Sequence, residues 1–463
     1  MSRTPRHRAA VVGTGHRAQT FTRALAERPD HLVAALCDPS PTRMAFHNRL
    51  LAEAGAPTAT QWELDRFADM LAKEEIDEVV VTTVDAEHDR YIVPALRAGC
   101  RVVTEKPMTV DADRCARILD TVRETGNSLT VAFNYRFNPV HEKVHALLAE
   151  GAVGEILSVH FEWLLDVHHG ADYFRRWHRE KDLSGGLMVH KSGHHFDLVN
   201  WWLADEPRDV FGYGRLGFYG RAAGERHGLR RAYDRAHGAD RAADDPFALD
   251  LAANDTLRAL YLDAERDDGY VRDRNVFDGP VTIEDDMAVL VRYAKGATMT
   301  YHLTAYSPWE GYRVMFNGSA GRLELEVEES RWQPPRTRIS SRGGALHGDT
   351  AAAEHPGGAR LTLRPLWRPP VNVPLVTAHE EHGGGDPRML DALFGPVDPA
   401  HAVDTGTAAH PTATERDGAL ALAVGLAANQ CFETGRPVAV RDLVPGLREA
   451  SGGREQAAQV QAR

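Results

Sequence analysis

The feature that most constrains the fold is a glycine-rich turn near the start of the chain. A short apolar stretch, 8–12, is followed at once by the segment GTGHRA (13–18) and then by a helical pattern that runs to Leu25. Glycines with this spacing allow a tight turn and let a phosphate approach the backbone N–H groups at the start of a helix. A second apolar stretch, 31–36, leads to Asp38, where a carboxylate can accept a hydrogen bond from a ribose hydroxyl. The combination predicts a dinucleotide-binding Rossmann domain.

Strands and helices go on alternating after this turn, the order expected of a doubly wound parallel sheet. Ligands of such sheets bind beyond the carboxyl ends of the strands. Two strands end at segments with polar side chains, 83–88 and 105–107. We therefore place the Rossmann domain at 8–134. Its candidate cofactor-binding residues are Gly13, Thr14, Gly15, His16, Arg17, Ala18, Asp38, Thr83, His88, Glu105 and Lys106.

The acidic side chain after the second strand bears on which dinucleotide binds. A carboxylate at Asp38 disfavours a 2'-phosphate, so we expect NAD, with NADP less favoured. Ser40 and Arg43 nearby leave the choice open. An α/β domain that binds no nucleotide is the alternative interpretation.

A second candidate site lies on a helix predicted between Ser184 and Trp202. At about 100° per residue, His190, His194 and Asp197 share one narrow stripe, opposite a largely apolar side. Such a helix is anchored in a core while it presents proton-handling groups to a cleft. The plainer alternative is a hydrogen-bonded surface stripe. Gly193, in mid-helix, indicates close approach by a ligand or another backbone.

Later in the chain the pattern changes to period-two strands separated by glycine turns. This predicts a second α/β domain built on a large, open, mostly antiparallel sheet. We assign 135–447 to this domain, for substrate binding and oligomer formation, and 448–463 to a flexible tail.

The second domain contains an insertion at about 220–280 that is rich in Arg and Asp. It includes a helical stretch, 254–266, and the segment 270–275. We interpret 270–275 and the later segment 382–386 as structural loops. The alternative is that they line a substrate site.

The composition excludes some classes of function. The formal net charge of the 463 residues is −12, so the chain lacks the basic footprint of a protein that binds nucleic acid or an anionic membrane. Four scattered cysteines show no CxxC or metal-ligand spacing. No apolar run has the length of a membrane span, and the run near the start is far shorter than a signal-peptide core. We therefore expect a cytoplasmic protein with no nucleic-acid or membrane partner.

Taken together, the motifs resemble the Gfo/Idh/MocA family, which includes glucose-fructose oxidoreductase and inositol dehydrogenase. The family pairs an N-terminal Rossmann domain with a C-terminal α/β domain whose open sheet often serves dimer formation. The resemblance therefore implies a homo-oligomer, either a dimer or a tetramer. It covers about residues 8–445 and rests on the glycine turn, Asp38, the segment 83–88, Glu105-Lys106-Pro107, Arg136 with Pro139, and the helix that carries the histidines.

The resemblance also implies roles for single residues. Lys106 would be the active-site lysine and His194 the catalytic histidine. The family has an aspartate one turn before this histidine, where this chain has His190. Lys191 is interpreted either as a cation at the rim of the cleft or as solvated charge. The candidate catalytic residues are Lys106, His194 and His190, and the candidate substrate-binding residues are Lys106, Arg136, His190, Lys191 and His194.

The same stripe of side chains has the spacing of ligands for a divalent ion. We expect no bound metal, because Lys106 already supplies the electrostatic stabiliser and would repel a cation. His190 would then act as a neutral hydrogen-bond partner of the substrate.

The implied activity is that of an NAD-dependent dehydrogenase. It would act on a secondary alcohol, or the matching ketone, of a sugar, glycoside or cyclitol. His194 would take the hydroxyl proton while Lys106 stabilises the developing alkoxide. One alternative is a redox-assisted glycosidase or lyase that recycles its NAD. The other is a sensor that binds dinucleotide without chemistry, against which the presence of Lys106 and His194 argues.

Overall fold

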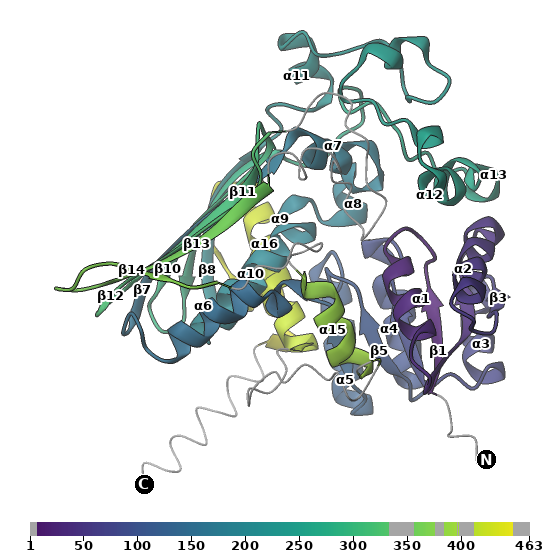
Figure 1. The fold of residues 1–463 in the computed structure, drawn as a ribbon, viewed down its shortest axis with the longest axis horizontal. Helices are drawn as coiled ribbons and strands as arrows, with labels where there is room; N and C mark the ends of the chain where they lie inside the picture. Colours follow the sequence, from purple (N-terminus) through teal and green to yellow (C-terminus); the bar gives the residue numbers. More distant parts are fainter. Residues whose placement is uncertain (1–6, 333–355, 376–383, 396, 398–411, 448–463) are drawn as a thin grey trace.

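The computed structural model describes residues 7–332, 356–375, 384–395, 397 and 412–447. These residues form two sheets with helices packed on them, which lie beside one another along the long axis of the molecule (Figure 1). The expected fold class is confirmed: a Rossmann-type domain precedes an α/β domain with a mostly antiparallel sheet. The expected tail at 448–463 lies outside the described residues.

The first sheet is parallel except for one edge strand. The strand order is β15-β6-β5-β4-β1-β2-β3, and β15 runs antiparallel to β6. From β1 the chain adds strands first on one side (β2, β3) and then on the other (β4, β5, β6). Ligands bind doubly wound sheets at the point where the strand order reverses in this way. The strands are β1 (His7–Val12), β2 (His31–Cys37), β3 (Thr60–Trp62), β4 (Glu78–Val81), β5 (Arg101–Thr104), β6 (Leu129–Val131) and β15 (Ala413–Thr414).

Helices cover both faces of this sheet, because successive side chains of a strand point to opposite faces. Ala10 and Val12 of β1 belong to one core, and Ala9 and Val11 to another. Helices α3, α4 and α5 contribute to the first core, and α1, α2 and α15 to the second. The helices are α1 (Ala18–Ala26), α2 (Pro41–Glu53), α3 (Phe67–Lys73), α4 (His88–Arg97), α5 (Ala112–Thr125) and α15 (Gly385–Phe394).

The second sheet has nine strands in the order β14-β13-β12-β11-β7-β10-β9-β8-β16. Strands β7 and β10 run parallel, and the other neighbours run antiparallel. The strands are β7 (Ile156–Asp166), β8 (Pro207–Arg215), β9 (Asp286–Tyr293), β10 (Thr298–Ser307), β11 (Glu310–Gly318), β12 (Gly321–Ser330), β13 (Pro356–Pro365), β14 (Val371–Val373) and β16 (Val438–Ala439).

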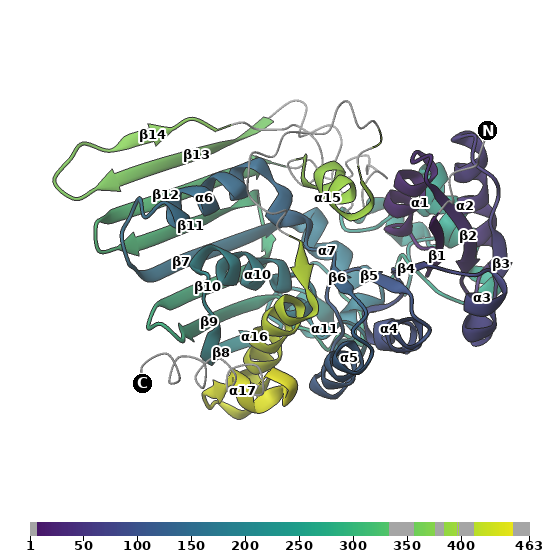
Figure 2. The ribbon, with the colours of Figure 1, turned by 90° about the horizontal axis from the view of Figure 1, so that it is seen from below.

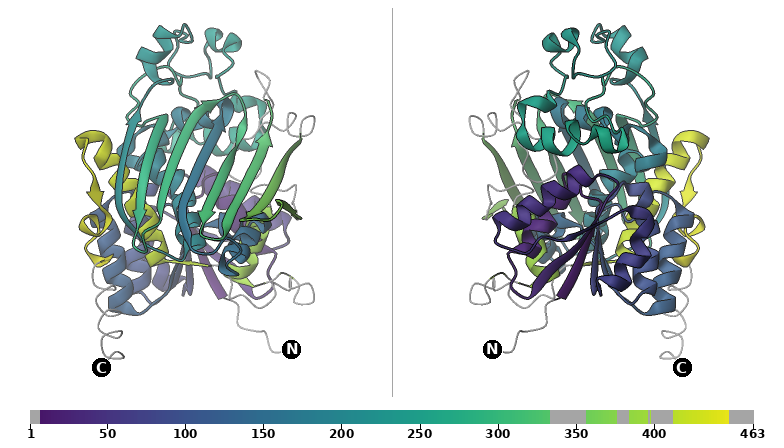
Figure 3. Two further views of the ribbon diagram at one scale, coloured as in Figure 1. Left: turned by 90° about the vertical axis from the view of Figure 1, so that its left-hand side faces the viewer. Right: turned by 90° about the vertical axis from the view of Figure 1, so that its right-hand side faces the viewer.

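Among the residues that the structure describes, helices pack on one face of the second sheet and the strands of the other face lie open (Figure 3, left). Strand β9 alternates accordingly: Met287, Val289 and Val291 are buried, whereas Leu290 is 47% exposed. Outside the insertion at 220–280, the helices of this domain include α6 (Pro139–Ala149), α7 (Val167–Arg175), α8 (Lys181–Ser184), α9 (Leu187–His190), α10 (Ser192–Leu203), α16 (Glu415–Thr434) and α17 (Val440–Leu443). No helix in the described part of the chain could cross a membrane.

The prediction of one continuous helix between Ser184 and Trp202 is wrong, because two helices, α9 and α10, occupy this stretch. Helix α8 ends at Ser184, and Gly185 and Gly186 adopt positive φ angles of 70° and 73° before α9 begins. Helix α9 then gives way to α10 at Lys191. There the backbone N–H of His194 donates to the Lys191 carbonyl at 3.3 Å, a tighter turn than that of an α-helix.

The C-terminal segment ties the two domains together. Strand β15 pairs with β6 of the first sheet, and α16 follows directly and packs on α9, α10 and β8 (Figure 2). Thr414 caps α16 through a reciprocal pair of hydrogen bonds with Asp417. Gly425 brings α16 close to α9, because a Cβ there would lie 2.6 Å from the Met188 carbonyl oxygen. The position of α9 therefore depends on α16.

Gly425→Ala should lower the free energy of unfolding by about 1–3 kcal/mol, because the added methyl would overpack the contact between α16 and α9. Gly193→Ala in α10 is the matched control. No other heavy atom of the described residues lies within 4 Å of a Cβ at Gly193, so this variant should gain roughly 1 kcal/mol from helix propensity. Denaturant unfolding of both variants checks the pair, and an unchanged stability of Gly425→Ala would contradict the proposed contact.

Candidate active site

The turn between β1 and α1 has the conformation that its sequence predicts. Gly13 has a φ of +82°, and a Cβ there would lie 2.7 Å from the Thr83 Cα, so a side chain does not fit. At Gly15, by contrast, no heavy atom of the described residues lies within 4 Å of a Cβ. The backbone is thus open to close approach immediately before α1, which Ala18 begins. This arrangement suits a pyrophosphate.

Asp38 lies at the end of β2, next to the same turn. Its Oδ2 accepts the Thr14 N–H at 2.6 Å. Its Oδ1 accepts the Ser40 N–H at 2.8 Å and the Arg43 Nε–H at 3.1 Å. A carboxylate oxygen can accept more than one hydrogen bond, so Oδ2 can also accept a ribose hydroxyl. The glycine turn and Asp38 therefore fit a dinucleotide cofactor.

Arg17 connects the turn to two other segments of the chain. Its Nε donates to Glu105 Oε1 at 2.6 Å, and its terminal nitrogens donate to Asp386 at 2.8 and 3.0 Å. Glu105 also accepts the Lys106 backbone N–H at 3.1 Å. Asp386, from the segment predicted as a structural loop, thus helps to hold the turn against the end of β5. Residues 382–383 of that segment lie outside the described residues.

His88 holds together two of the loops that follow the strands. It is fully buried, its Nδ1 lies 2.9 Å from the Pro107 carbonyl oxygen, and its Nε2 lies 3.2 Å from the Thr83 carbonyl oxygen. Burial lowers the pKa of His88, so the ring is neutral at neutral pH. His88 therefore fixes the loop after β4 relative to the loop after β5.

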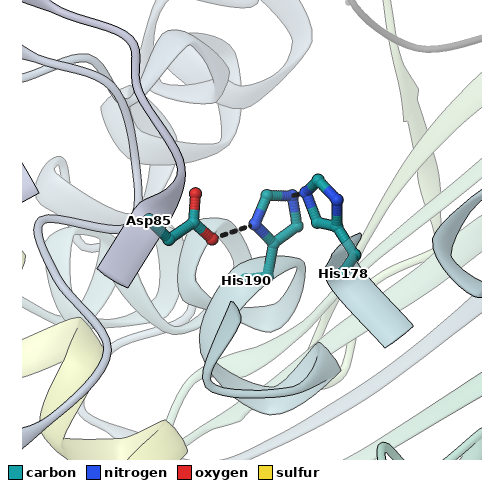
Figure 4. A group of neighbouring side chains, drawn as sticks. All are labelled: Asp85, His178 and His190. Atoms are coloured by element: carbon teal, nitrogen blue, oxygen red, sulfur yellow. Dashed lines mark hydrogen bonds and ion pairs between the residues drawn. The ribbon is translucent and has the colours of Figure 1, made fainter. Parts of the chain in front are cut away.

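The centre of the candidate site is a contact between the two domains. The Lys106 Nζ, after β5, donates to both the Nε2 and the carbonyl oxygen of His190 at 3.3 Å. The His190 Nδ1 hydrogen-bonds to Asp85 Oδ2 at 2.5 Å, and its Nε2 lies 3.1 Å from the Nε2 of His178. Figure 4 shows the His190 ring between the Asp85 carboxylate and the His178 ring. A half-buried lysine, two buried histidines and a buried carboxyl group thus form one cluster.

Burial shifts the protonation of this cluster. It lowers the pKa of Lys106 to about 8, although Glu105 and Asp85 act in the opposite direction. Burial, and then the neighbouring cations, lower the pKa of His190 well below its usual value. Burial raises the pKa of Asp85, although Lys106 opposes it. At neutral pH His190 therefore remains a neutral acceptor for the lysine ammonium.

Asp85, His178 and His190 also form a potential set of metal ligands. One ligand atom from each lies within 4.8 Å of the others. The Lys106 ammonium approaches the same Nε2 of His190 that a metal would use, and two unit charges about 4 Å apart repel by about 4 kcal/mol at an effective dielectric near 20. That no metal binds here therefore stays our prediction.

Lys191 lies at the break between α9 and α10, and His194 lies in the first turn of α10. The His194 ring stacks on Tyr135 with 4.3 Å between ring centroids. The Lys191 Nζ donates to the Tyr135 hydroxyl at 3.0 Å and lies 4.7 Å from the centroid of the Trp163 ring. Lys191 is 5% exposed, and burial lowers its pKa. The interpretation of Lys191 as solvated charge is thus wrong, because aromatic side chains enclose its ammonium.

Arg136 and Asp197 form a buried ion pair. The Nε and Nη2 of Arg136 donate to the two Asp197 oxygens at 2.8 and 2.6 Å, and Nη2 lies 3.4 Å from Asp417. Burial raises the pKa of Asp197 to about 6, against the effect of Arg136. In the described structure Asp197 therefore pairs with Arg136, and this pair joins α10 to the segment before α6.

Sequence reasoning missed two members of the cluster. Asp85 lies four residues after the end of β4, and its place beyond the carboxyl end of a parallel strand is a signal that could have identified it. His178 lies in a single turn of 3-10 helix, 177–179, with no recognisable motif around it. Gly193 was predicted to allow close approach, and its open side within a buried stretch fits a ligand better than another backbone.

Comparisons with known proteins identify the family to which both domains are similar. Residues 7–133 match the model of an oxidoreductase family with an NAD-binding Rossmann fold, GFO_IDH_MocA. Residues 145–440 match the C-terminal α/β domain of the same family. The chain is 32% identical over 434 residues to the putative oxidoreductase YteT of Bacillus subtilis (strain 168), covering 91% of this chain and 95% of YteT.

Other similarities are partial or lie in the fold alone. The inositol 2-dehydrogenase of Rhizobium meliloti (strain 1021) is 29% identical over 203 residues, covering 44% of this chain and 57% of that protein. The crystal structure of aldose-aldose oxidoreductase from Caulobacter crescentus, complexed with glycerol, superposes with a TM-score of 0.58 at 17% identity. That superposition covers 94% of this chain and 99% of the other.

His190→Asp should cost about 1–3 kcal/mol of stability, because it removes the hydrogen bond to Asp85 and places a second carboxyl group against it. The exchange Asp85→Asn with His190→Asp should restore at least about 1 kcal/mol of that loss, because an amide can donate to the new carboxylate. Unfolding of the two single variants and the double variant gives the coupling energy. Strictly additive losses would contradict a direct interaction between positions 85 and 190.

Proposed function

Because the chain belongs to the Gfo/Idh/MocA family of oxidoreductases, we propose that it oxidises a secondary alcohol of a sugar, glycoside or cyclitol with NAD, or reduces the matching ketone. The observation that carries the proposal is the Lys106 ammonium held on His190 at the carboxyl edge of the Rossmann sheet. Inositol dehydrogenases among the relatives support a polyhydroxylated substrate.

The cofactor proposal rests on the residues around the glycine turn. The backbone at Gly13 and Gly15, with the start of α1, would hold the pyrophosphate, and Asp38 would accept a hydrogen bond from the adenosine ribose. When bound, NAD supplies the acceptor for the hydride. The carboxylate of Asp38 favours NAD over NADP.

The side chains of this protein handle the charge and the proton. An ammonium has three N–H donors, and Lys106 gives two hydrogen bonds to His190. The third can donate to the substrate oxygen and stabilise negative charge there. In the proposal, His194 takes the hydroxyl proton, and stacking on Tyr135 fixes the orientation of the His194 ring. Asp85 acts through His190 and is thus a positioning residue for Lys106.

Turnover on a panel of polyols and glycosides tests the proposal. The formation of NADH should be measurable with at least one substrate class, and Lys106→Ala and His194→Ala should each lose on the order of 10²–10⁴ in rate. Both variants should bind NAD nearly as well as the wild type, because neither side chain holds the adenosine half in this proposal. Lys295→Ala, an exposed lysine in the turn between β9 and β10, is the control and should keep full activity.

The other outcomes of this panel separate the alternatives. Cleavage of a glycoside without accumulation of NADH would replace the dehydrogenase with a redox-assisted lyase. Tight NAD binding with no turnover on any substrate would favour a sensor. Full activity of His194→Ala would require a different proton acceptor.

The pH dependence of kcat/KM for alcohol oxidation should fall above about pH 8. Burial lowers the pKa of Lys106 to about 8, so the lysine is protonated below that pH and neutral above it. In the proposed mechanism the protonated form is the active one, so the rate is lost as pH rises through the pKa. Lys106→Arg keeps its charge and should show a reduced rate without this decline. A wild-type rate that keeps rising to about pH 10 would contradict the role of the ammonium.

A further inference from the structure

The insertion of the second domain reaches back to the first domain. In Figure 1 the teal segment leaves the end of the second sheet, and α12 and α13 lie next to α2 of the Rossmann domain. We call residues 255–268 the strap. They comprise α12 (Asp255–Leu257), a π-helical turn (Arg258–Leu262) and α13 (Glu265–Asp268), so the stretch predicted as helical over 254–266 is helical for most of its length and is interrupted after Leu262. A π-turn often marks a functional segment.

The end of the strap contacts the ribose corner of the candidate cofactor site. Asp267 Oδ2 accepts the Ser40 hydroxyl at 2.5 Å and the Thr42 backbone N–H at 3.1 Å. Asp268 forms an ion pair with a terminal nitrogen of Arg43, whose Nε donates to Asp38. The carboxylate expected to bind the ribose, Asp38, is therefore linked through Arg43 to a carboxylate of the second domain.

The middle of the strap contacts the glycine turn. The Tyr261 hydroxyl, in the π-helical turn, accepts the His16 backbone N–H at 3.3 Å. The strap thus lies along both parts of the site that would hold the adenosine half of a dinucleotide, the turn at His16 and the ribose corner at Asp38.

Ion pairs on both sides of the strap hold it in this position. Arg235 pairs with Glu265 at 2.5 Å and with Asp273 at 2.8 Å. Arg272 pairs with Asp172 of α7 at 2.7 Å, so the segment 270–275 has the structural role that its sequence suggested. These contacts fix the strap to the second domain independently of any nucleotide.

The strap changes the charge of the ribose corner. Asp38 and Arg43 alone would leave it neutral. The strap adds Asp267 and Asp268 together with Arg266, which lies 3.8 Å from Asp267, so the corner becomes negative by one unit charge. In Rossmann domains a nearby arginine is the side chain that accommodates a 2'-phosphate. Here Asp38 and Asp268 both bind the guanidinium of Arg43.

We propose that the strap is a specificity element supplied by the second domain, in which Asp267 and Asp268 exclude a 2'-phosphorylated dinucleotide from the ribose corner. This inference rests on the proposed function, because it assumes that the corner binds adenosine ribose. Both carboxylates would repel the phosphate dianion, and Asp268 also neutralises the buried guanidinium of Arg43 that could bind it.

Calorimetric titration with NAD and with NADP tests the proposal. The wild type should bind NAD at least about tenfold tighter than NADP. The variant Asp267→Asn/Asp268→Asn keeps the size of both side chains and one acceptor oxygen on each, and should narrow this preference about tenfold by strengthening NADP binding. Adding Arg43→Ala to it should remove the gained NADP affinity, because Arg43 would be the released phosphate ligand.

The control is Asp255→Asn/Asp263→Asn, which removes two charges from exposed positions of the same strap. It should leave the ratio of the two affinities unchanged. The inference would be overturned if all three proteins bind NAD and the ratio of the NAD affinity to the NADP affinity is the same in the wild type, the control and Asp267→Asn/Asp268→Asn. The proposed function would still stand in that case. A wild type that binds neither dinucleotide would overturn both.

Discussion

The hydrogen bonds from Lys106 to His190 are the interaction on which the candidate site depends. The lysine follows β5 of the Rossmann sheet and the histidine ends α9 of the second domain, so the pair exists only while the domains are docked. Other features hold that docking in place: β15 completes the first sheet, α16 packs on α9, and the strap contacts α2. The C-terminal segment and the insertion therefore serve the site as well as the fold.

Burial explains why this contact is suited to chemistry. Partial burial of an ammonium is unfavourable unless it is hydrogen-bonded, and the half-buried Lys106 meets an imidazole nitrogen and a backbone carbonyl instead of a direct ion pair. Its pKa of about 8 leaves both protonation states accessible near neutral pH. Asp85 lies behind His190 rather than against the lysine, so its carboxyl group orients the imidazole and leaves the ammonium available to a substrate.

The parts of the site that are local in sequence were predictable, and the parts that depend on tertiary contacts were not. The turn at Gly13 and the place of Asp38 follow from one strand, one turn and one helix, and the structure has them as expected. The partners of His190 could not be identified from helical spacing, because Asp85 comes from a distant part of the chain and His178 from a separate 3-10 turn. For the same reason the helical spacing could not show that Asp197 pairs with Arg136, which lies on another element.

Transfer of a deuterium label tests the central claim most directly. The substrate would be a sugar or cyclitol that carries deuterium at the carbon to be oxidised, incubated with NAD and the wild-type protein. The proposed chemistry predicts that deuterium appears on the nicotinamide in an amount equal to the ketone formed. Product formed without deuterium in the cofactor would contradict hydride transfer at the cluster of Lys106, His190 and Asp85.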